Sequence, residues 1–308
     1  MFDCITMKSG SYVYQEISAV IERLEQNQIL YIEENFIERM KAIDILELQM
    51  LDDIEQVNNS TLTGAEKLRF MQRAEVLKLK LDGANERLFA HLLDRIRSND
   101  WSTVKQYFKQ AEQQISRRTD EDDVGYDEID MLVNGLLEVG FVPQEPEERD
   151  ADMLFYQPTP ARIILKLVAE LHATTDDIFY DLGSGIGHVP ILVNLLTGIK
   201  TKGVELEESY IRYSDECLKK LGLPNVEFIK ADARHADYQD GTIFYMYTPF
   251  QGALLQQVLM KLEAESKQRP IRVCAYGPCT LQVSKQKWLQ PIYQTGKREG
   301  CLGIFRSI

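Results

Sequence analysis

The stretch "FYDLGSGIGHVP", residues 179–190, carries three glycines at alternate positions, Gly183, Gly185 and Gly187. It follows a short apolar, β-rich run and precedes an apolar run that begins at about His188 and has helical spacing. Glycine permits the positive φ of a tight turn and lets the backbone approach a ligand closely. The first amides of a helix have no partner within that helix, so they can bind a ligand. We therefore predict that this turn, with Ser184 in it, lies under a nucleotide-bearing molecule.

The spacing of the glycines narrows the choice of ligand. A dinucleotide-binding turn has the pattern GxGxxG, whereas here the glycines fall at GxGxG and His188 stands where the last glycine should be. The sequence holds no GxxxxGK[ST], which excludes a nucleoside-triphosphate P-loop. Asp181 directly precedes the turn and suits a cationic amine better than a pyrophosphate. This favours S-adenosylmethionine, with an NAD-dependent oxidoreductase as the weaker alternative.

The stretch resembles motif I of the class I S-adenosylmethionine-dependent methyltransferases. The resemblance implies that Glu205, which ends "TKGVEL", accepts both ribose hydroxyls, because a carboxylate can take two donors from a diol. It also implies that Asp232, in "FIKADAR", accepts from the adenine amino group, with the backbone of Ala233 nearby. Both acids stand at a predicted strand end, in the order that this family has.

The segments "YDLGSGIGHVPILVNLLTG" and "GVELEESYIRYSDE" resemble the non-SET histone-lysine methyltransferases of the disruptor-of-telomeric-silencing type. This resemblance covers residues 153–250, about a third of the chain. The segment "FYQPTPARIIL" precedes the glycine turn at the distance of the loop that covers the methionine end of the cofactor in that family. By the resemblance, Tyr156, Gln157 and Thr159 contact that end.

The residues expected near the methyl acceptor differ from those of the family. Where the family has an asparagine and a phenylalanine, "TIFYMYTPF" has Tyr247 and Thr248. The tetrapeptide "YTPF" also resembles the [ND]PP[FY] of enzymes that methylate adenine or glutamine nitrogen, but a phenol cannot accept both hydrogens of a planar NH₂ group. Tyr245 and Tyr247 share one face of the predicted strand, so both can line a channel for a lysine, which reacts as the neutral amine. One cofactor-facing and one core tyrosine is the alternative.

Two parts of the chain have different hydrophobic periodicities. Residues 12–139 have apolar residues three or four apart and no proline, which is typical of packed helices. The charged segment "VPQEPEERDAD", residues 142–152, is the predicted boundary. Beyond it, short β-rich runs alternate with helical ones, which predicts an α/β fold. We expect an acidic α-helical domain over 1–145, and a Rossmann-like methyltransferase domain over 146–308 with a mostly parallel sheet and a terminal antiparallel strand.

The acidity of the chain is uneven. The net charge is −13, and residues 1–150 hold 31 acidic and 17 basic side chains, whereas the rest holds 17 and 18. This balance argues against a general nucleic-acid surface, and it predicts that the helical domain attracts basic partners such as histone tails. We expect a cytoplasmic protein without a membrane span. The five cysteines and four histidines lack the spacings of disulfide frameworks or metal sites. His188 is expected to cap its helix or face solvent, with a place in the active site as the alternative.

These features predict a methyltransferase that uses S-adenosylmethionine and acts on a protein side chain of the lysine type. A small molecule or a nucleic acid is the alternative acceptor. Because Tyr247 replaces the asparagine of the family, a cofactor-binding scaffold that acts through its helical domain without catalysis is a further alternative.

Overall fold

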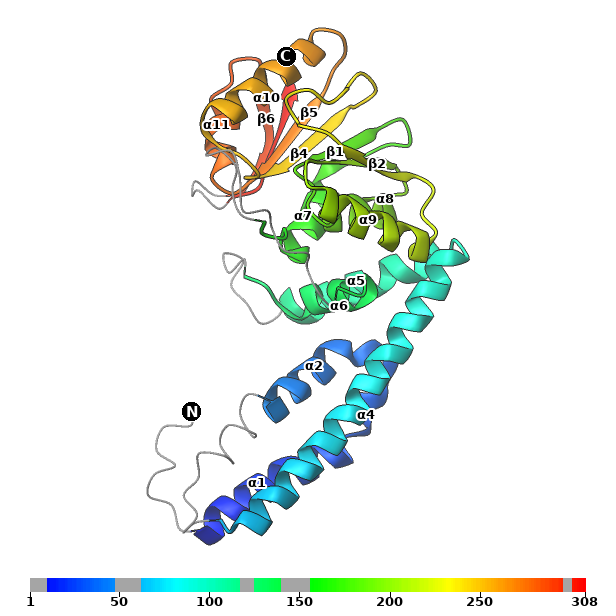
Figure 1. Cartoon of the computed structure of the whole chain (residues 1–308), viewed down its shortest axis with the longest axis vertical. Helices are drawn as coiled ribbons and strands as arrows, with labels where there is room; N and C mark the ends of the chain where they lie inside the picture. Colours follow the sequence, from blue (N-terminus) through cyan, green and yellow to red (C-terminus); the bar gives the residue numbers. More distant parts are fainter. Residues whose placement is uncertain (1–9, 48–61, 117–124, 140–155, 296–300) are drawn as a thin grey trace. The chain divides into compact units, whose positions relative to one another are not determined.

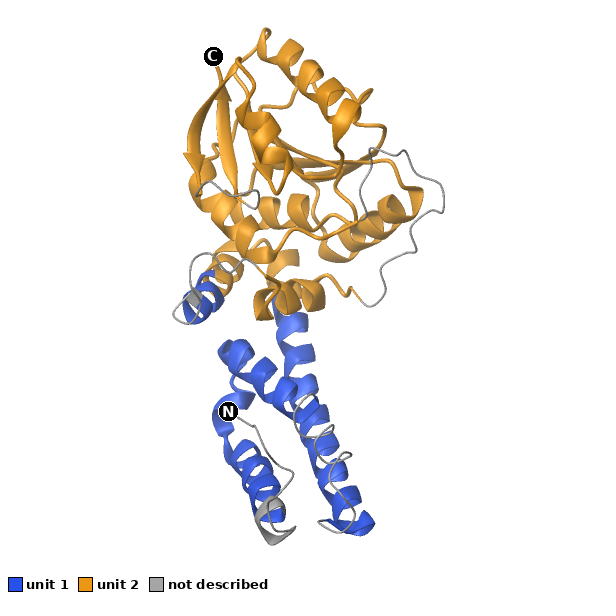
Figure 2. Ribbon diagram, turned by 90° about the vertical axis from the view of Figure 1, so that its left-hand side faces the viewer, with its two compact units in different colours: residues 1–92, 109–119 blue, residues 93–108, 120–308 orange. Residues whose placement is uncertain are grey.

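The computed structural model describes residues 10–47, 62–116, 125–139, 156–295 and 301–308. The chain divides into two compact units (Figure 2). Unit 1 comprises residues 1–92 and 109–119, and unit 2 comprises residues 93–108 and 120–308. The boundary predicted between residues 145 and 146 lies outside the described residues and stays a prediction.

Unit 1 is built from helices whose apolar residues recur at helical spacing. It contains α1 (Gly10–Gln26), η2 (Gln28–Tyr31), η3 (Glu33–Asn35), α2 (Phe36–Asp44), most of α4 (Gly64–Arg97) and the second half of α5 (Trp101–Ser116). The α4 helix places Phe70, Ala74, Leu77 and Leu81 on one face, where they are buried with apolar residues of α1 and α2. This packing follows the predicted periodicity, because a helix brings residues three and four apart onto one side.

Unit 2 contains a seven-stranded sheet in the order β3-β2-β1-β4-β5-β7-β6. The strands are β1 (Ile178–Leu182), β2 (Lys200–Glu205), β3 (Val226–Lys230), β4 (Ile243–Tyr247), β5 (Arg272–Tyr276), β6 (Leu289–Gln294) and β7 (Gly303–Ser307). The first five pair in parallel, and β7 runs antiparallel to both β5 and β6. The predicted α/β fold with a terminal antiparallel strand is confirmed.

Helices cover both faces of this sheet (Figure 1). One face carries α7 (Ala161–Leu171), α8 (His188–Thr197) and α9 (Glu208–Leu221), and the other carries α10 (Gly252–Ser266) and α11 (Cys279–Ser284). The α6 helix (Glu128–Leu136) packs on α7 and belongs to unit 2. The central strands β1 and β4 are therefore buried on both faces, as the continuous apolar runs of parallel strands require.

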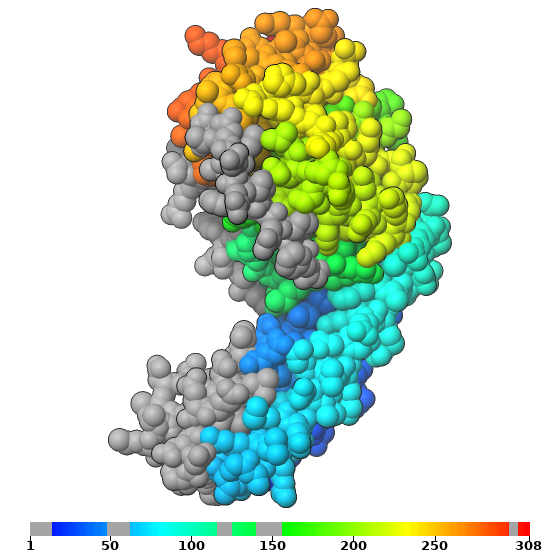
Figure 3. Space-filling model, in the orientation of Figure 1, coloured from blue at the N-terminus to red at the C-terminus, as the bar shows by residue number. Residues whose placement is uncertain are grey.

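The parallel strands end at one edge of the sheet, and the connections that follow them lie there. In doubly wound sheets this edge binds ligands, because each strand turns into a helix at that point. In the space-filling view, the second half of the chain forms a continuous yellow-green to orange surface on the face shown (Figure 3).

Other expectations concern cysteines, membranes and metals. The described cysteines, Cys217, Cys274, Cys279 and Cys301, are buried free thiols, and Cys4 lies outside the described residues. Within the described ranges, no helix has the length and apolarity needed to cross a membrane. Over the same ranges, no three His, Cys, Asp or Glu side chains are grouped as metal ligands would be.

Candidate functional site

The glycine turn joins the end of β1 to the start of α8, as predicted. Gly183, Gly185 and Gly187 have φ values of 83°, 53° and 90°, and Gly187 is the residue that precedes α8. A Cβ on Gly183 would lie 2.4 Å from Cβ of Pro249, and one on Gly185 would lie 2.1 Å from Cε2 of Tyr156. Only glycine fits these two positions, because the turn is packed directly against the two segments that flank the site.

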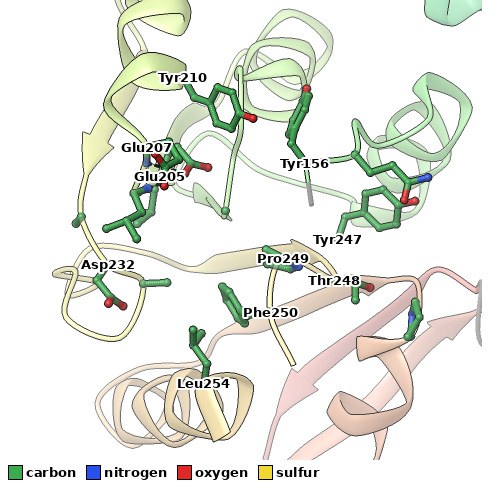
Figure 4. A pocket seen from close by; sticks show the side chains of 17 residues that line it. Tyr156, Glu205, Glu207, Tyr210, Asp232, Tyr247, Thr248, Pro249, Phe250 and Leu254 are labelled. Carbon is green, nitrogen blue, oxygen red and sulfur yellow. Dashed lines mark hydrogen bonds between the residues drawn. The ribbon is translucent and has the colours of Figure 1, made fainter. Parts of the chain in front are cut away.

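A cavity of about 260 Å³ opens beside this turn (Figure 4). Asp232 and Leu254 lie at one end of it, and Tyr156 and Tyr247 lie at the other, with Glu205 on the wall between them (Figure 4). Of the predicted site residues, the cavity is lined by Tyr156, Gln157, Gly183, Glu205, Asp232, Ala233 and Tyr247. The structure thus gathers seven residues that the sequence spreads over more than ninety positions.

Glu205, at the end of β2, accepts hydrogen bonds from three backbone amides. Its Oε2 accepts from Gly185 at 2.8 Å, and its Oε1 accepts from Leu206 at 2.7 Å and from Glu207 at 2.9 Å. Burial raises the pKa of this carboxyl, although the three amides lower it in part. A carboxylate has about four acceptor positions, so Oε2 keeps capacity for a further donor from the cavity.

Asp232, which follows β3, is paired with Arg234. Its two oxygens accept from Nε of Arg234 at 3.0 Å each, and Oδ2 also accepts from Nη2 at 2.6 Å. The hydrogen bonds from Arg234 are the main reason why the pKa of Asp232 is lowered. This end of the cavity therefore holds an ionised acceptor, with the apolar side chains of Phe250 and Leu254 beside it.

Asp181, in β1, and Ser184, in the glycine turn, do not line the cavity. Asp181 is 3% exposed, and its burial, with repulsion from Glu205, raises its pKa well above the ordinary value. Ser184 is 7% exposed, and its hydroxyl has no hydrogen-bond partner within the part of the chain that the structure describes. The cavity lining likewise does not include Gly185, Gly187, Thr159 or Tyr245.

The two candidate tyrosines of β4 occupy different places. Tyr247 is half-buried and lines the cavity, and its ring lies 4.8 Å from that of Tyr276. Tyr245 is fully buried, and its hydroxyl lies 3.2 Å from Oγ1 of Thr159. Burial raises the pKa of Tyr247 to about 12, so its phenol is neutral near pH 7. Tyr245 lies deeper because it is inside the strand, whereas Tyr247 is the residue at which the strand ends.

The residue after Tyr247 has a strained backbone. Thr248 has a φ of 39°, a left-handed conformation that is rare for a side chain with a branched Cβ. Its Oγ1 donates to the backbone carbonyl of Tyr276 at 3.1 Å. Such strain persists only where the surroundings hold it, and it is concentrated at functional sites. Here it bends the chain from β4 into the cavity wall formed by Pro249 and Phe250.

Sequence reasoning placed His188 wrongly and missed Tyr210. His188 does not face solvent: it is 7% exposed, and it hydrogen-bonds with Asn134 and Tyr156. Tyr210, in the first turn of α9, lines the cavity, and its ring lies 5.2 Å from that of Tyr156. Neither position has a local signal, because both depend on where segments distant in the sequence meet.

Comparisons with known proteins agree with this geometry. Residues 154–224 match the model of the family described as "Histone methylation protein DOT1". A curated relative from Saccharolobus islandicus, described as "Protein-lysine N-methyltransferase", is 28% identical over 94 residues, which make up 30% of this chain and 58% of the relative.

Two solved structures are similar to part of this chain. An RNA methyltransferase from Salinibacter ruber, in complex with S-adenosyl-L-homocysteine, is 22% identical with a TM-score of 0.39, and the match covers 49% of this chain and 92% of that one. A SAM-dependent methyltransferase from Aquifex aeolicus is 18% identical with a TM-score of 0.37, covering 48% and 93%.

The residues that match the family model include β1 and β2 of the sheet in unit 2. The predicted resemblance to the disruptor-of-telomeric-silencing type is confirmed over residues 154–224, and unit 2 has the seven-stranded, mostly parallel sheet of an α/β fold.

Proposed function

We propose that this chain transfers a methyl group from S-adenosylmethionine to an amine of a protein side chain, of the lysine type. One observation carries the proposal. A single cavity has carboxylate acceptors, Glu205 and Asp232, toward one end and the half-buried phenol of Tyr247 at the other, with the glycine turn beside it.

The nucleoside end of the cofactor fits the carboxylate end of the cavity. Glu205 would accept from the ribose, since its Oε2 has room for one further donor. Asp232 would accept from the adenine amino group, with the backbone of Ala233 adjacent. Phe250 and Leu254 supply apolar surface beside this position for the adenine ring.

The amino-acid end fits the glycine turn. A ligand ammonium beside Asp181 would stabilise the ionised form of this carboxyl, which burial by itself disfavours. Tyr156 and Gln157 line the cavity near that point, and Thr159 lies behind them against Tyr245. In this arrangement Ser184, Gly185 and Gly187 form the turn under the methionine and the ribose.

The tyrosine end is where we place the acceptor. When bound, the cofactor would supply a methyl group on a sulfonium. The acceptor ammonium would first release a proton to solvent, and the lone pair of the neutral amine would then form the N–C bond as the S–C bond breaks and its electron pair stays on sulfur. The half-buried ring of Tyr247 lines this end and packs against the buried ring of Tyr276. Burial favours the neutral amine, which carries the reactive lone pair. The Tyr247 hydroxyl would orient that amine, and Tyr245 would support the wall from beneath through Thr159.

A protein substrate is supported by two findings. The family that matches residues 154–224 methylates histones by its description, and the archaeal relative is described as acting on protein lysine. The acidic excess of residues 1–150 would draw basic substrates toward the chain at low salt.

The test begins with calorimetric titration of the full chain with S-adenosylmethionine, S-adenosylhomocysteine and NAD. Binding of the first two without NAD supports the cofactor assignment, and lysine-bearing and acidic peptides, nucleic acids and small amines are then screened as acceptors. Tyr247→Phe should lower kcat about tenfold while cofactor affinity changes less than about twofold. Tyr180→Phe, whose hydroxyl bonds Asp240 away from the cavity, is the matched control.

A second candidate rests on Tyr247 standing where the family has an asparagine. In that case the chain binds the cofactor without turnover. Tight binding of S-adenosylmethionine with no methyl transfer to any class of acceptor would support this scaffold function and contradict the catalytic one.

A further inference from the structure

Tyr156 is held against the glycine turn by its hydroxyl. The hydroxyl donates to Nδ1 of His188 at 3.2 Å, and the backbone N–H of Ile186 also hydrogen-bonds to it. The ring lies so close to Gly185 that a methyl group there would overlap it. The orientation of this cavity-lining ring is therefore set by the turn and by the first residue of α8.

The partner of His188 comes from a helix much earlier in the chain. Nε2 of His188 lies 3.0 Å from Oδ1 of Asn134, which is in α6. An amide oxygen only accepts, so Nε2 carries the proton and Nδ1 is left as an acceptor for the Tyr156 hydroxyl. Burial lowers the pKa of His188 to about 4, so the ring is neutral at physiological pH and this arrangement is maintained.

Two further hydrogen bonds reach the segment that follows Tyr156, one from Tyr126, which precedes α6, and one from Asp130 inside α6. The Tyr126 hydroxyl donates to the backbone carbonyl of Pro158 at 2.8 Å. Oδ1 of Asp130 accepts from the backbone amide of Ala161 at 2.8 Å. These contacts hold the segment between Tyr156 and α7 from the side of α6.

We propose that α6 is part of the cofactor site: Asn134 sets the tautomer of His188, and His188 holds Tyr156 over the cavity. Asn134 and His188 are positioning residues that act through Tyr156. This inference rests on the proposed function, because it takes the cavity to be the S-adenosylmethionine site. It adds to that function a contribution from a helix that precedes the predicted domain boundary.

The test measures the affinity of the full chain for S-adenosylhomocysteine by calorimetry. His188→Leu removes both hydrogen bonds and should weaken binding about tenfold, since it leaves buried polar groups unpaired. His188→Gln keeps an acceptor for Tyr156 and a donor for Asn134, and it should restore affinity to within about twofold of the native value. Asn134→Leu should give a loss in the same direction, so the test does not depend on one variant folding.

Asn194→Leu is the matched control for a structural effect. Asn194 is buried near the other end of α8, where its amide donates to the backbone carbonyl of Ile199 at 2.7 Å. This variant should lose thermal stability, as His188→Leu does, without loss of affinity. An equal loss of affinity in both variants would mean that general destabilisation of α8 explains the effect, and the inference would be wrong.

A double-mutant cycle with Tyr156→Phe gives the decisive readout. If His188 acts through the Tyr156 hydroxyl, His188→Leu should cost little further affinity once that hydroxyl is gone. Additive losses would overturn the inference while leaving the cofactor assignment intact. Failure of the native chain itself to bind S-adenosylhomocysteine would instead overturn the proposed function and this inference with it.

Discussion

The Glu205 carboxylate accepts the backbone amide of Gly185 at 2.8 Å, and this contact joins the end of β2 to the glycine turn after β1. The acid that the sequence assigns to the ribose thus also holds the turn in place. Because the turn packs against Tyr156 and Pro249, a change at Glu205 also affects the two cavity-lining segments that hold these residues.

Replacement of Glu205 tests this double role. Glu205→Ala should weaken cofactor binding by about 1.5 to 3 kcal/mol, since a charge-assisted acceptor is lost and three amides lose their partner. Glu207→Ala, a change of the neighbouring cavity-lining carboxylate, should have a much smaller effect. Calorimetry with S-adenosylhomocysteine measures both, and unchanged affinity in Glu205→Ala would refute the ribose assignment.

In the ligand-free chain, Asp181→Asn should make the melting temperature less dependent on pH. Burial raises the pKa of Asp181 well above its ordinary value of 3.8. A group with a raised folded pKa stabilises the fold fully below its unfolded pKa, and this contribution is lost as the pH rises through the folded value. The melting temperature should therefore fall as the pH rises from the ordinary pKa of 3.8 through the raised folded pKa, more steeply in the native chain than in the variant.

The same Asp181→Asn variant should bind S-adenosylmethionine about tenfold more weakly, because the ligand ammonium loses an anionic partner. Thermal melts across a pH series and calorimetry at neutral pH give the two readouts. If the melting temperatures of the native chain and the variant change with pH to the same extent, Asp181 is not the source of the pH-dependent stability.

Gly185→Ala should abolish measurable cofactor binding and lower the melting temperature. The new Cβ would lie 2.1 Å from the ring of Tyr156, at a residue whose φ is 53°. Gly198→Ala is the control, because its φ of 82° is also positive but no atom of the described residues lies within 4 Å of the new Cβ. The control should lose only about 1 to 2 kcal/mol of stability from backbone strain and keep its affinity. Similar affinity losses in both variants would contradict the packing argument.

Arg234→Ala separates two roles of Asp232. If Asp232 binds the adenine amino group, Asp232→Ala should weaken binding about tenfold, whereas Arg234→Ala keeps the acceptor and should weaken it far less. If Asp232 only anchors Arg234, the two substitutions should have equal effects, since either one removes the same ion pair. Titration of both variants with S-adenosylhomocysteine decides between these roles.

Much of the catalytic fold can be predicted from the sequence because its signals are local. The β-rich runs, the helical runs and the turn with Gly183, Gly185 and Gly187 each depend on residue types within about ten positions. The family resemblance also pointed to Glu205, which ends β2, and to Asp232, which follows β3, and both line the cavity.

The side-chain environment of the site was decided by tertiary structure. Tyr247 lines the cavity while Tyr245 is fully buried, a choice that the two-residue repeat left open. His188 is buried between Tyr156 and Asn134, although its place at the start of a helix suggested exposure. These contacts join segments 32 and 54 residues apart, and such packing leaves no local pattern in the sequence.

The sequence by itself therefore determined the ligand-binding turn, the order of strands and helices, and the acids that end β2 and follow β3. Only the tertiary structure decided which tyrosine faces the cavity, why Gly185 tolerates no side chain, and that α6 reaches the site through His188. The physical reason is that local conformation follows from neighbouring residues, whereas a cavity wall is made by whichever distant side chains pack together.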